Sequence, residues 1–156
     1  MIFSHLSYCI TTWTMVGPTT LTPVEVLYKK ALKILDKKPI SYHHCNILDK
    51  YNLLSFDSFC KFSYCCLIYK TLHGLAPPCL QDSFKYRQSR ATRSVANREI
   101  EVPFRKTAFS HNALSIKGSA LWNSMPVHIR ECPSLATFFK KQVKTWLRGQ
   151  QMCTHI

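Results

Sequence analysis

Residues 55–78, SFDSFCKFSYCCLIYKTLHGLAPP, decide the fold class of this chain. Ser55 is a good helix N-cap, and the apolar stretch 56–72 that follows is long enough for about five helical turns. Gly74 suits a left-handed position after the last turn, and the proline pair at the end of the stretch forbids continuation. The stretch therefore predicts a long helix whose core-facing side chains are Phe59, Phe62, Cys66, Tyr69 and Leu72.

Helices are also predicted before this stretch. Thr22 at an N-cap, Pro23 at the first helical position and Glu25 three residues after the cap form a capping box, and Pro39 stops the helix that follows. A shorter helix is expected over 44–51. Residues 1–16 lack a basic leader and are interrupted by polar side chains, so we expect a buried amphipathic helix there rather than a signal peptide or a membrane anchor.

The pattern changes after residue 99. Residues 100–104 (IEVPF) and 108–116 (AFSHNALSI) alternate like short strands, which predicts a β-hairpin turning at 105–106 or 111–112 and ending at Gly118. A short helix through 120–122 should follow and stop at Pro126. Ser134 then caps a final amphipathic helix, residues 135–148, whose apolar side chains are Leu135, Phe138, Phe139, Val143, Trp146 and Leu147.

These elements add up to a mainly α fold. With 156 residues and 46% hydrophobic content, the chain is long and apolar enough for one packed domain. We divide it into an N-terminal helical bundle (1–84), a basic linker (85–99), a small α+β piece (100–149) and a tail (150–156). The α+β piece contains the β-hairpin and the terminal amphipathic helix.

Positive charge is the strongest feature of the composition. The chain has 21 Lys and Arg against eight Asp and Glu, a net charge of +13, and residues 85–156 hold thirteen basic and three acidic side chains, or +10. Such a balance favours a polyanionic partner, and the basic side chains could neutralise the phosphates of a nucleic acid. The candidate phosphate-binding residues are Arg87, Arg90, Arg93, Arg98, Arg105 and Lys106, followed on the last helix by Lys140, Lys141 and Lys144.

Aromatic residues interleave with these cations. Tyr86, Phe104 and Phe109 are candidates to stack on bases. The alternative is a solvated basic loop without a ligand, and the lysines of the last helix are equally explained as the wet side of an amphipathic helix.

The eight cysteines do not indicate a metal site. No export signal is evident, so we expect an intracellular protein, nuclear or cytoplasmic, in which most thiols act as small buried hydrophobes. A zinc-like set, Cys60, Cys65, His73 and Cys79, has the wrong spacing, because Cys60 and Cys65 lie about 140° apart on one helix. The run 43–45, His-His-Cys, is also weak. We predict no metal and no cofactor.

No catalytic pattern stands out either. The four Asp residues are isolated in sequence, whereas metal-dependent phosphoryl transfer needs paired carboxylates. No nucleophile elbow, phosphate-binding loop or zinc-protease motif occurs. A Cys–His dyad stays open, but nothing local indicates one, and we expect no enzyme.

Several segments together resemble the C-terminal part of LINE-type (non-LTR) retrotransposon reverse transcriptases. They include Leu6-Ser7-Tyr8-Cys9 with Trp13, LYKKALKILDKKP at 27–39, and the run from Tyr69 to Pro77. Arg90-Ala91-Thr92-Arg93-Ser94 and Val102-Pro103 belong to the same likeness. The most specific part is Gly118-x-x-Leu121-Trp122-Asn123-Ser124-Met125-Pro126-x-x-Ile129-Arg130, followed by Phe138-Phe139-Lys140 and Lys144-x-Trp146-Leu147.

The resemblance implies the helical thumb and the segment beyond it, which grip template, primer and element RNA. The aspartate pair of the polymerase palm is absent, so we expect nucleic-acid binding without polymerase activity, in a truncated element or a clipped gene model. A protein partner replacing the missing palm, or a remnant with no selected function, are the alternatives. We interpret the signature residues Trp122, Asn123 and Pro126 as structural, with a binding motif as the alternative.

Overall fold

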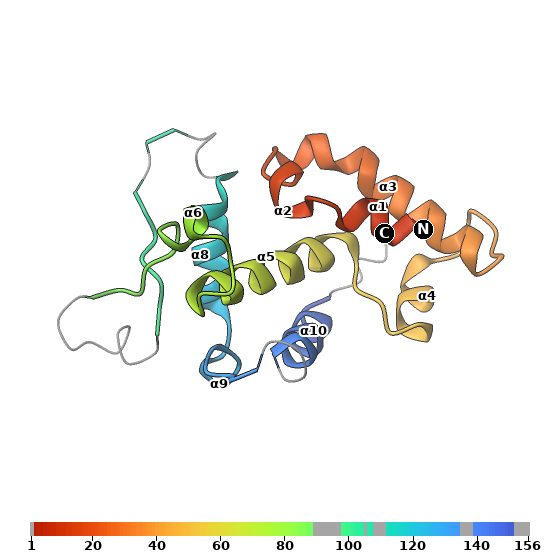
Figure 1. Ribbon diagram of the computed structural model, residues 1–156. Helices are drawn as coiled ribbons and strands as arrows, with labels where there is room; N and C mark the ends of the chain where they lie inside the picture. The colour runs from red at the N-terminus through yellow and green to blue at the C-terminus, as the bar shows by residue number, and fades with distance from the viewer. Residues whose placement is uncertain (1, 89–97, 105, 108–111, 135–138, 152–156) are drawn as a thin grey trace.

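The computed structural model describes residues 2–88, 98–104, 106–107, 112–134 and 139–151, and in them the chain is mainly helical, as predicted (Figure 1). The first helices in chain order are α1 (Ile2–Ser7), α2 (Ile10–Trp13), α3 (Pro18–Leu35) and α4 (His44–Lys50). The others are α5 (Phe56–Leu72), α6 (Pro78–Gln81), α8 (Leu114–Ser124), α9 (Val127–Arg130) and α10 (Lys140–Gly149).

Helix α5 is the central element, and the sequence predicted its bounds. The Ser55 side chain accepts a hydrogen bond from the Ser58 N–H at 3.3 Å, and Gly74 adopts a φ of +69° after the last turn. The predicted core-facing residues do pack on the core: Tyr69 is buried, and Phe59, Phe62, Cys66 and Leu72 are partly buried against the larger hydrophobic cluster. The prediction missed the other buried apolar side chains of α5, which are Phe56, Cys60, Tyr64, Cys65 and Ile68. Partners pack on two sides of α5, so its buried side chains do not follow one helical stripe.

Helix α3 begins five residues earlier than the capping box predicts. Pro18 occupies its first turn with Gly17 as N-cap, and Pro23 lies inside the helix. The Thr22 hydroxyl donates to the Pro18 carbonyl at 3.3 Å instead of capping. Leu21 explains the earlier start, because this half-buried side chain packs on the hydrophobic cluster below α3.

That cluster covers the N-terminal half of α5. It joins α5 to α2, α3 and α4 through the buried side chains Ile10, Tyr28, Leu32, Ile47, Leu48, Phe56, Cys60 and Tyr64. Two polar contacts fix it from inside: the Tyr28 hydroxyl donates to the Leu54 carbonyl at 2.6 Å, and the Thr14 and Tyr64 hydroxyls lie 2.6 Å apart. The ends of α3 and α4 are joined by Asp36, whose carboxylate accepts from Lys50 and Tyr51.

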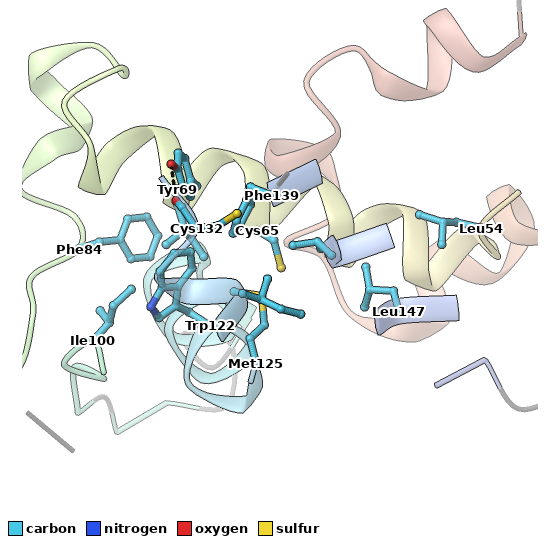
Figure 2. Packing of buried hydrophobic residues seen from close by; sticks show 13 residues of the cluster. Leu54, Cys65, Tyr69, Phe84, Ile100, Trp122, Met125, Cys132, Phe139 and Leu147 are labelled. Atoms are coloured by element: carbon cyan, nitrogen blue, oxygen red, sulfur yellow. Dashed lines mark hydrogen bonds between the residues drawn. The ribbon is translucent and has the colours of Figure 1, made fainter. Parts of the chain in front are cut away.

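A larger cluster surrounds the C-terminal half of α5 (Figure 2). Here Trp122 of α8 packs with Phe139, Met125 and the Cys65–Tyr69 side of α5, and Val143 and Leu147 of α10 close the cluster. The Tyr69 hydroxyl donates to the Cys132 carbonyl at 2.8 Å. Phe84 and Ile100 belong to the same cluster, so it joins residues from both sides of the basic linker.

The predicted strands are partly wrong. Residues 114–116 are the first turn of α8, and Gly118 lies inside that helix, where a Cβ would sit 2.9 Å from Ile68 Cδ1. The residue is therefore used for close helix packing rather than for a chain stop. Residue 105 and residues 108–111, which carry the proposed hairpin turns, lie outside the described residues. Among the described residues, β pairing is limited to one isolated antiparallel bridge, between Tyr86 and Ile100.

The C-terminal helix agrees with its predicted pattern where it is described. Phe139, Val143 and Leu147 are buried and Trp146 is partly buried against the larger cluster. Residues 135–138 lie outside the described residues, so the predicted start after Ser134 stays a prediction. The short helix α9 was not predicted. Each helix in the described ranges is too short or too polar to cross a bilayer.

Candidate nucleic-acid interface

The two ends of the basic segment are joined by backbone hydrogen bonds. The Arg87 N–H donates to the Glu99 carbonyl and the Glu101 N–H donates to the Lys85 carbonyl, both at 2.9 Å, around the Tyr86–Ile100 bridge. We call residues 85–87 and 99–101 the neck. Figure 1 shows the chain leaving and returning at the outer side of α8. The neck therefore joins the two ends of the sequence segment between residues 87 and 99; we call this segment the basic loop, and its residues 89–97 lie outside the described residues.

Asn123 of α8 fastens this neck to the core. The Ile100 N–H donates to Asn123 Oδ1 at 2.8 Å, and Asn123 Nδ2 donates to the Ile100 carbonyl at 2.9 Å. The side-chain amide thus pairs with both backbone groups of Ile100 as a neighbouring strand would. Trp122, fully buried, adds a 3.4 Å hydrogen bond from its indole N–H to the Arg98 carbonyl.

These contacts support the structural interpretation of Trp122, Asn123 and Pro126. Trp122 fills the core, Asn123 holds backbone, and Pro126 is the N-cap residue of α9. All three use their polar or rigid groups inside the protein. Their identity is thus explained without a ligand.

The described candidate cations at the neck are exposed. Arg87 and Arg98 flank the base of the loop, and Arg87 Nη1 lies 3.9 Å from Glu99 Oε2. Arg98 has a φ of +51°, a left-handed conformation that is uncommon for an arginine. Lys106 is also exposed. Arg90, Arg93 and Arg105 lie outside the described residues.

One of the candidate stacking residues is strongly exposed. Phe104, just after the neck, keeps 86% of its surface accessible, whereas Tyr86 is half-buried. An exposed aromatic ring is the kind of surface on which nucleic-acid bases stack. Phe109 lies outside the described residues.

The lysines of α10 form a separate basic surface. Lys140 and Lys141 are exposed and Lys144 is half-buried, on a helix that packs against α5. Figure 1 shows α10 below α5, away from the neck at the outer side of α8. The structure therefore does not bring these lysines together with Arg87 and Arg98.

Arg130 is a buried cation that sequence analysis did not select. Only 4% of it is exposed, and its Nε and Nη1 have no hydrogen-bond partner within the described residues. Burial lowers the pKa of its guanidinium, while the nearby Glu99 and Glu131 oppose that shift. Its position at the end of the signature was the only signal for it in the sequence.

The cysteines do not form the zinc-like set. Burial raises the pKa of Cys60 to about 12 and that of Cys65 as well, which opposes the thiolate that zinc needs. Within the described ranges, the one group of three potential ligands is His43, His44 and Cys45, with ligand atoms within 4.8 Å of one another.

That histidine–cysteine group is a poor cation site. Cys45 is disulfide-bonded, so it offers no thiolate. Burial, and then the positive charges of Lys29, His43 and Lys33, lower the pKa of His44. The same surrounding cations would repel a metal ion.

Comparisons of the chain with protein-family models, with curated proteins and with solved structures found no match.

Proposed function

We propose that this chain binds RNA or DNA without catalysing a reaction on it, as the retained nucleic-acid-gripping part of a LINE-type reverse transcriptase. The observation that supports this most is the closed neck. It holds Arg87 and Arg98 at the base of one loop whose sequence is basic and free of acid between them. A tethered cluster of cations loses less conformational freedom on binding phosphates than a free tail would.

Composition and exposure support the same proposal. The +10 charge of residues 85–156 supplies the long-range attraction, and exposed Phe104 supplies a candidate stacking surface beside the neck. Neither feature distinguishes one base from another. We therefore propose backbone binding with little sequence preference.

The first experiment measures binding of labelled single-stranded RNA as a function of salt. If the four loop arginines each neutralise one phosphate, affinity should fall about 50-fold between about 50 and 200 mM salt from these contacts alone. Changing Arg87, Arg90, Arg93 and Arg98 to Gln should remove that part of the salt dependence and most of the binding. Unchanged affinity in this quadruple variant would overturn the assignment to the loop.

A matched control separates the loop from general charge. Changing Lys30, Lys33, Lys37 and Lys38 to Gln removes the same four charges from the region around the end of α3. The loop proposal expects this variant to keep most of the RNA affinity. Equal losses in both variants would mean that net charge, rather than the loop, binds the RNA.

The non-catalytic part of the proposal has its own test. Primer extension with Mg²⁺ and deoxynucleotides should give no product, since the resemblance does not include the aspartates of the polymerase palm. Extension by the purified chain would contradict it.

A further inference from the structure

Helix α3 is apolar on two opposite sides. Tyr28 and Leu32 point into the cluster that covers α5 and are almost fully buried. On the other side, Val26, Leu27 and Ile34 keep 42%, 63% and 76% of their surfaces exposed. A helix that is apolar on both sides is normally enclosed between two layers, and here only the inner layer is present among the described residues.

The exposed side chains form a continuous stripe. At 100° per residue, Thr19, Pro23, Val26, Leu27, Lys30 and Ile34 fall within an arc about 100° wide along the whole helix. Thr19, Thr22, Pro23, Val26 and Leu27 also line one shallow groove of about 640 Å³. We call the surface of the six residues in this arc the outer face of α3. Its width equals that of the apolar stripe that a helix normally presents to a packing partner.

The charged side chains around the outer face of α3 indicate the kind of partner that fits it. Between Pro18 and Lys38 the chain has five lysines, Lys29, Lys30, Lys33, Lys37 and Lys38, against Glu25 and Asp36. Both carboxylates are already used, because Glu25 pairs with Lys29 at 2.6 Å and Asp36 pairs with Lys50 at 2.6 Å. Lys30, in the middle of the outer face, has no ion pair within the described residues.

A second copy of the chain would meet the same lysines. Two outer faces placed together bring like charges close to one another, which opposes self-association. An acidic amphipathic helix would instead bury the aliphatic side chains and neutralise the uncompensated lysines. Helix-in-groove recognition of this kind reads apolar anchors at i, i+3, i+4 and i+7. On α3 itself, Pro23, Val26 and Leu27 stand at i, i+3 and i+4, and Ile34 follows Leu27 by seven residues on the same face.

We propose that the outer face of α3 is a docking site for an amphipathic helix with aliphatic anchors and acidic flanks. This site is distinct from the basic loop, which leaves the fold beside α8, and it does not depend on the nucleic-acid proposal. It gives the chain a protein partner in addition to a polyanionic one.

The test uses the full chain and two synthetic helical peptides as long as α3. Both carry leucines at i, i+3, i+4 and i+7 spacing, one with glutamates beside them and the other with lysines in the same places. Fluorescence anisotropy should show saturable binding of the glutamate peptide and at least tenfold weaker binding of the lysine peptide. Equal binding of the two, or no binding of either, would overturn the proposal.

Variants then locate the site. Leu27→Asp and Ile34→Asp change exposed side chains, so the fold should survive, and each should weaken binding of the glutamate peptide tenfold or more. Leu75→Asp is the matched control, because Leu75 is also 63% exposed and receives the same charge, but it lies beyond α5. It should change affinity less than twofold. A loss equal to that of Leu27→Asp would mean general attraction of an acidic peptide to a basic protein.

The oligomeric state distinguishes the remaining occupant. The proposal expects a monomer in sedimentation experiments on the chain alone. A dimer that Leu27→Asp dissociates and Leu75→Asp leaves intact would show that a second copy covers the face, and would overturn the acidic-helix assignment.

Discussion

Asn123 offers the sharpest test of how the basic loop is attached. The neck ladder uses backbone groups of Lys85, Arg87, Glu99 and Glu101, so the N–H and C=O of Ile100 point away from it and toward Asn123. Ile100 is fully buried, so water cannot easily replace the amide. Asn123→Ala therefore leaves one donor and one acceptor without a partner inside the protein.

The cost follows from these two groups. A buried polar group without a partner costs about 1–3 kcal/mol, so we expect Asn123→Ala to lower the free energy of unfolding by about 2–4 kcal/mol. For a chain of this size that corresponds to a fall in Tm of about 5–15 °C. Urea unfolding followed by tryptophan fluorescence measures it, since Trp122 is fully buried next to the site.

The neighbouring residue supplies the control. Ser124 is exposed and its hydroxyl only donates to the Leu121 carbonyl of its own helix at 2.7 Å, so Ser124→Ala should change stability by less than about 0.5 kcal/mol. If Asn123→Ala is too unstable for a complete urea unfolding curve, hydrogen exchange at the Ile100 amide provides a second measurement. Ile100 should be protected in the natural chain and in Ser124→Ala. Equal stability and equal Ile100 protection in the two variants would refute the claim that the Asn123 side chain holds the Ile100 backbone.

Three further predictions concern the rest of the fold. Thiol labelling of the native chain should modify exposed Cys9 and Cys79 quickly, whereas buried Cys60 and Cys65 should react only after unfolding, because burial also raises the pKa of each thiol. Fast labelling of Cys65 would contradict the packing of α5. Gly118→Val should lower the free energy of unfolding by roughly 1–3 kcal/mol, because its Cβ would meet Ile68 at 2.9 Å and Phe84 at 3.4 Å. Gly149→Val is the control and should change stability by less than about 0.5 kcal/mol, because no atom lies within 4 Å of a Cβ at that position. Similar urea midpoints for the two variants would show that α8 and α5 do not approach so closely. Hydrogen bonds from Lys50 and Tyr51 lower the pKa of Asp36. The contribution of Asp36 to the free energy of unfolding is therefore present above its unfolded-state pKa, about 3.9, and is lost as pH falls through the lower folded-state pKa. Asp36→Asn should reduce the loss of stability at acid pH, and the same dependence of stability on pH in variant and natural chain would contradict the hydrogen bonds from Lys50 and Tyr51.

The parts of the fold that sequence predicted well are those with local signals. For α5, a capping serine, a glycine in the left-handed region and two prolines stand within a few residues of the helix ends, and each acts on backbone next to it. No tertiary contact can easily override signals that agree in this way. The mainly α class follows from this and the other helical segments.

Where signals conflicted, tertiary packing decided. Two prolines compete for the start of α3, and the helix begins at Pro18, which lets Leu21 reach the cluster under it. Similarly, 113–116 alternates like a strand, but Leu114 and Leu121, seven residues apart, both pack on the two clusters when the segment is helical. Short apolar runs fit either period until their partners are known.

For the candidate interface, the sequence predicted only which basic residues it contains and not how they are held together. The excess of arginine is visible in the sequence, but the closed neck depends on bonds between residues separated by a dozen positions or more, and the Asn123–Ile100 pair spans 23 positions. Nothing about an asparagine indicates which backbone group it will hold. From the sequence, Asn123 is predicted to help end a helix, whereas in the structure its side-chain amide holds the backbone of Ile100.

The residues that carry the family resemblance and those that carry the charge are physically connected. Trp122 and Asn123 hold the chain at Arg98 and Ile100, which is the return end of the basic loop. A change at Asn123 removes no charge, yet it loosens the base on which Arg87 and Arg98 stand. If the proposed function is right, Asn123→Ala should weaken RNA binding under conditions where the chain is still folded, and Ser124→Ala should not. The signature would then contribute to binding by fixing the loop, without any of its side chains touching the nucleic acid.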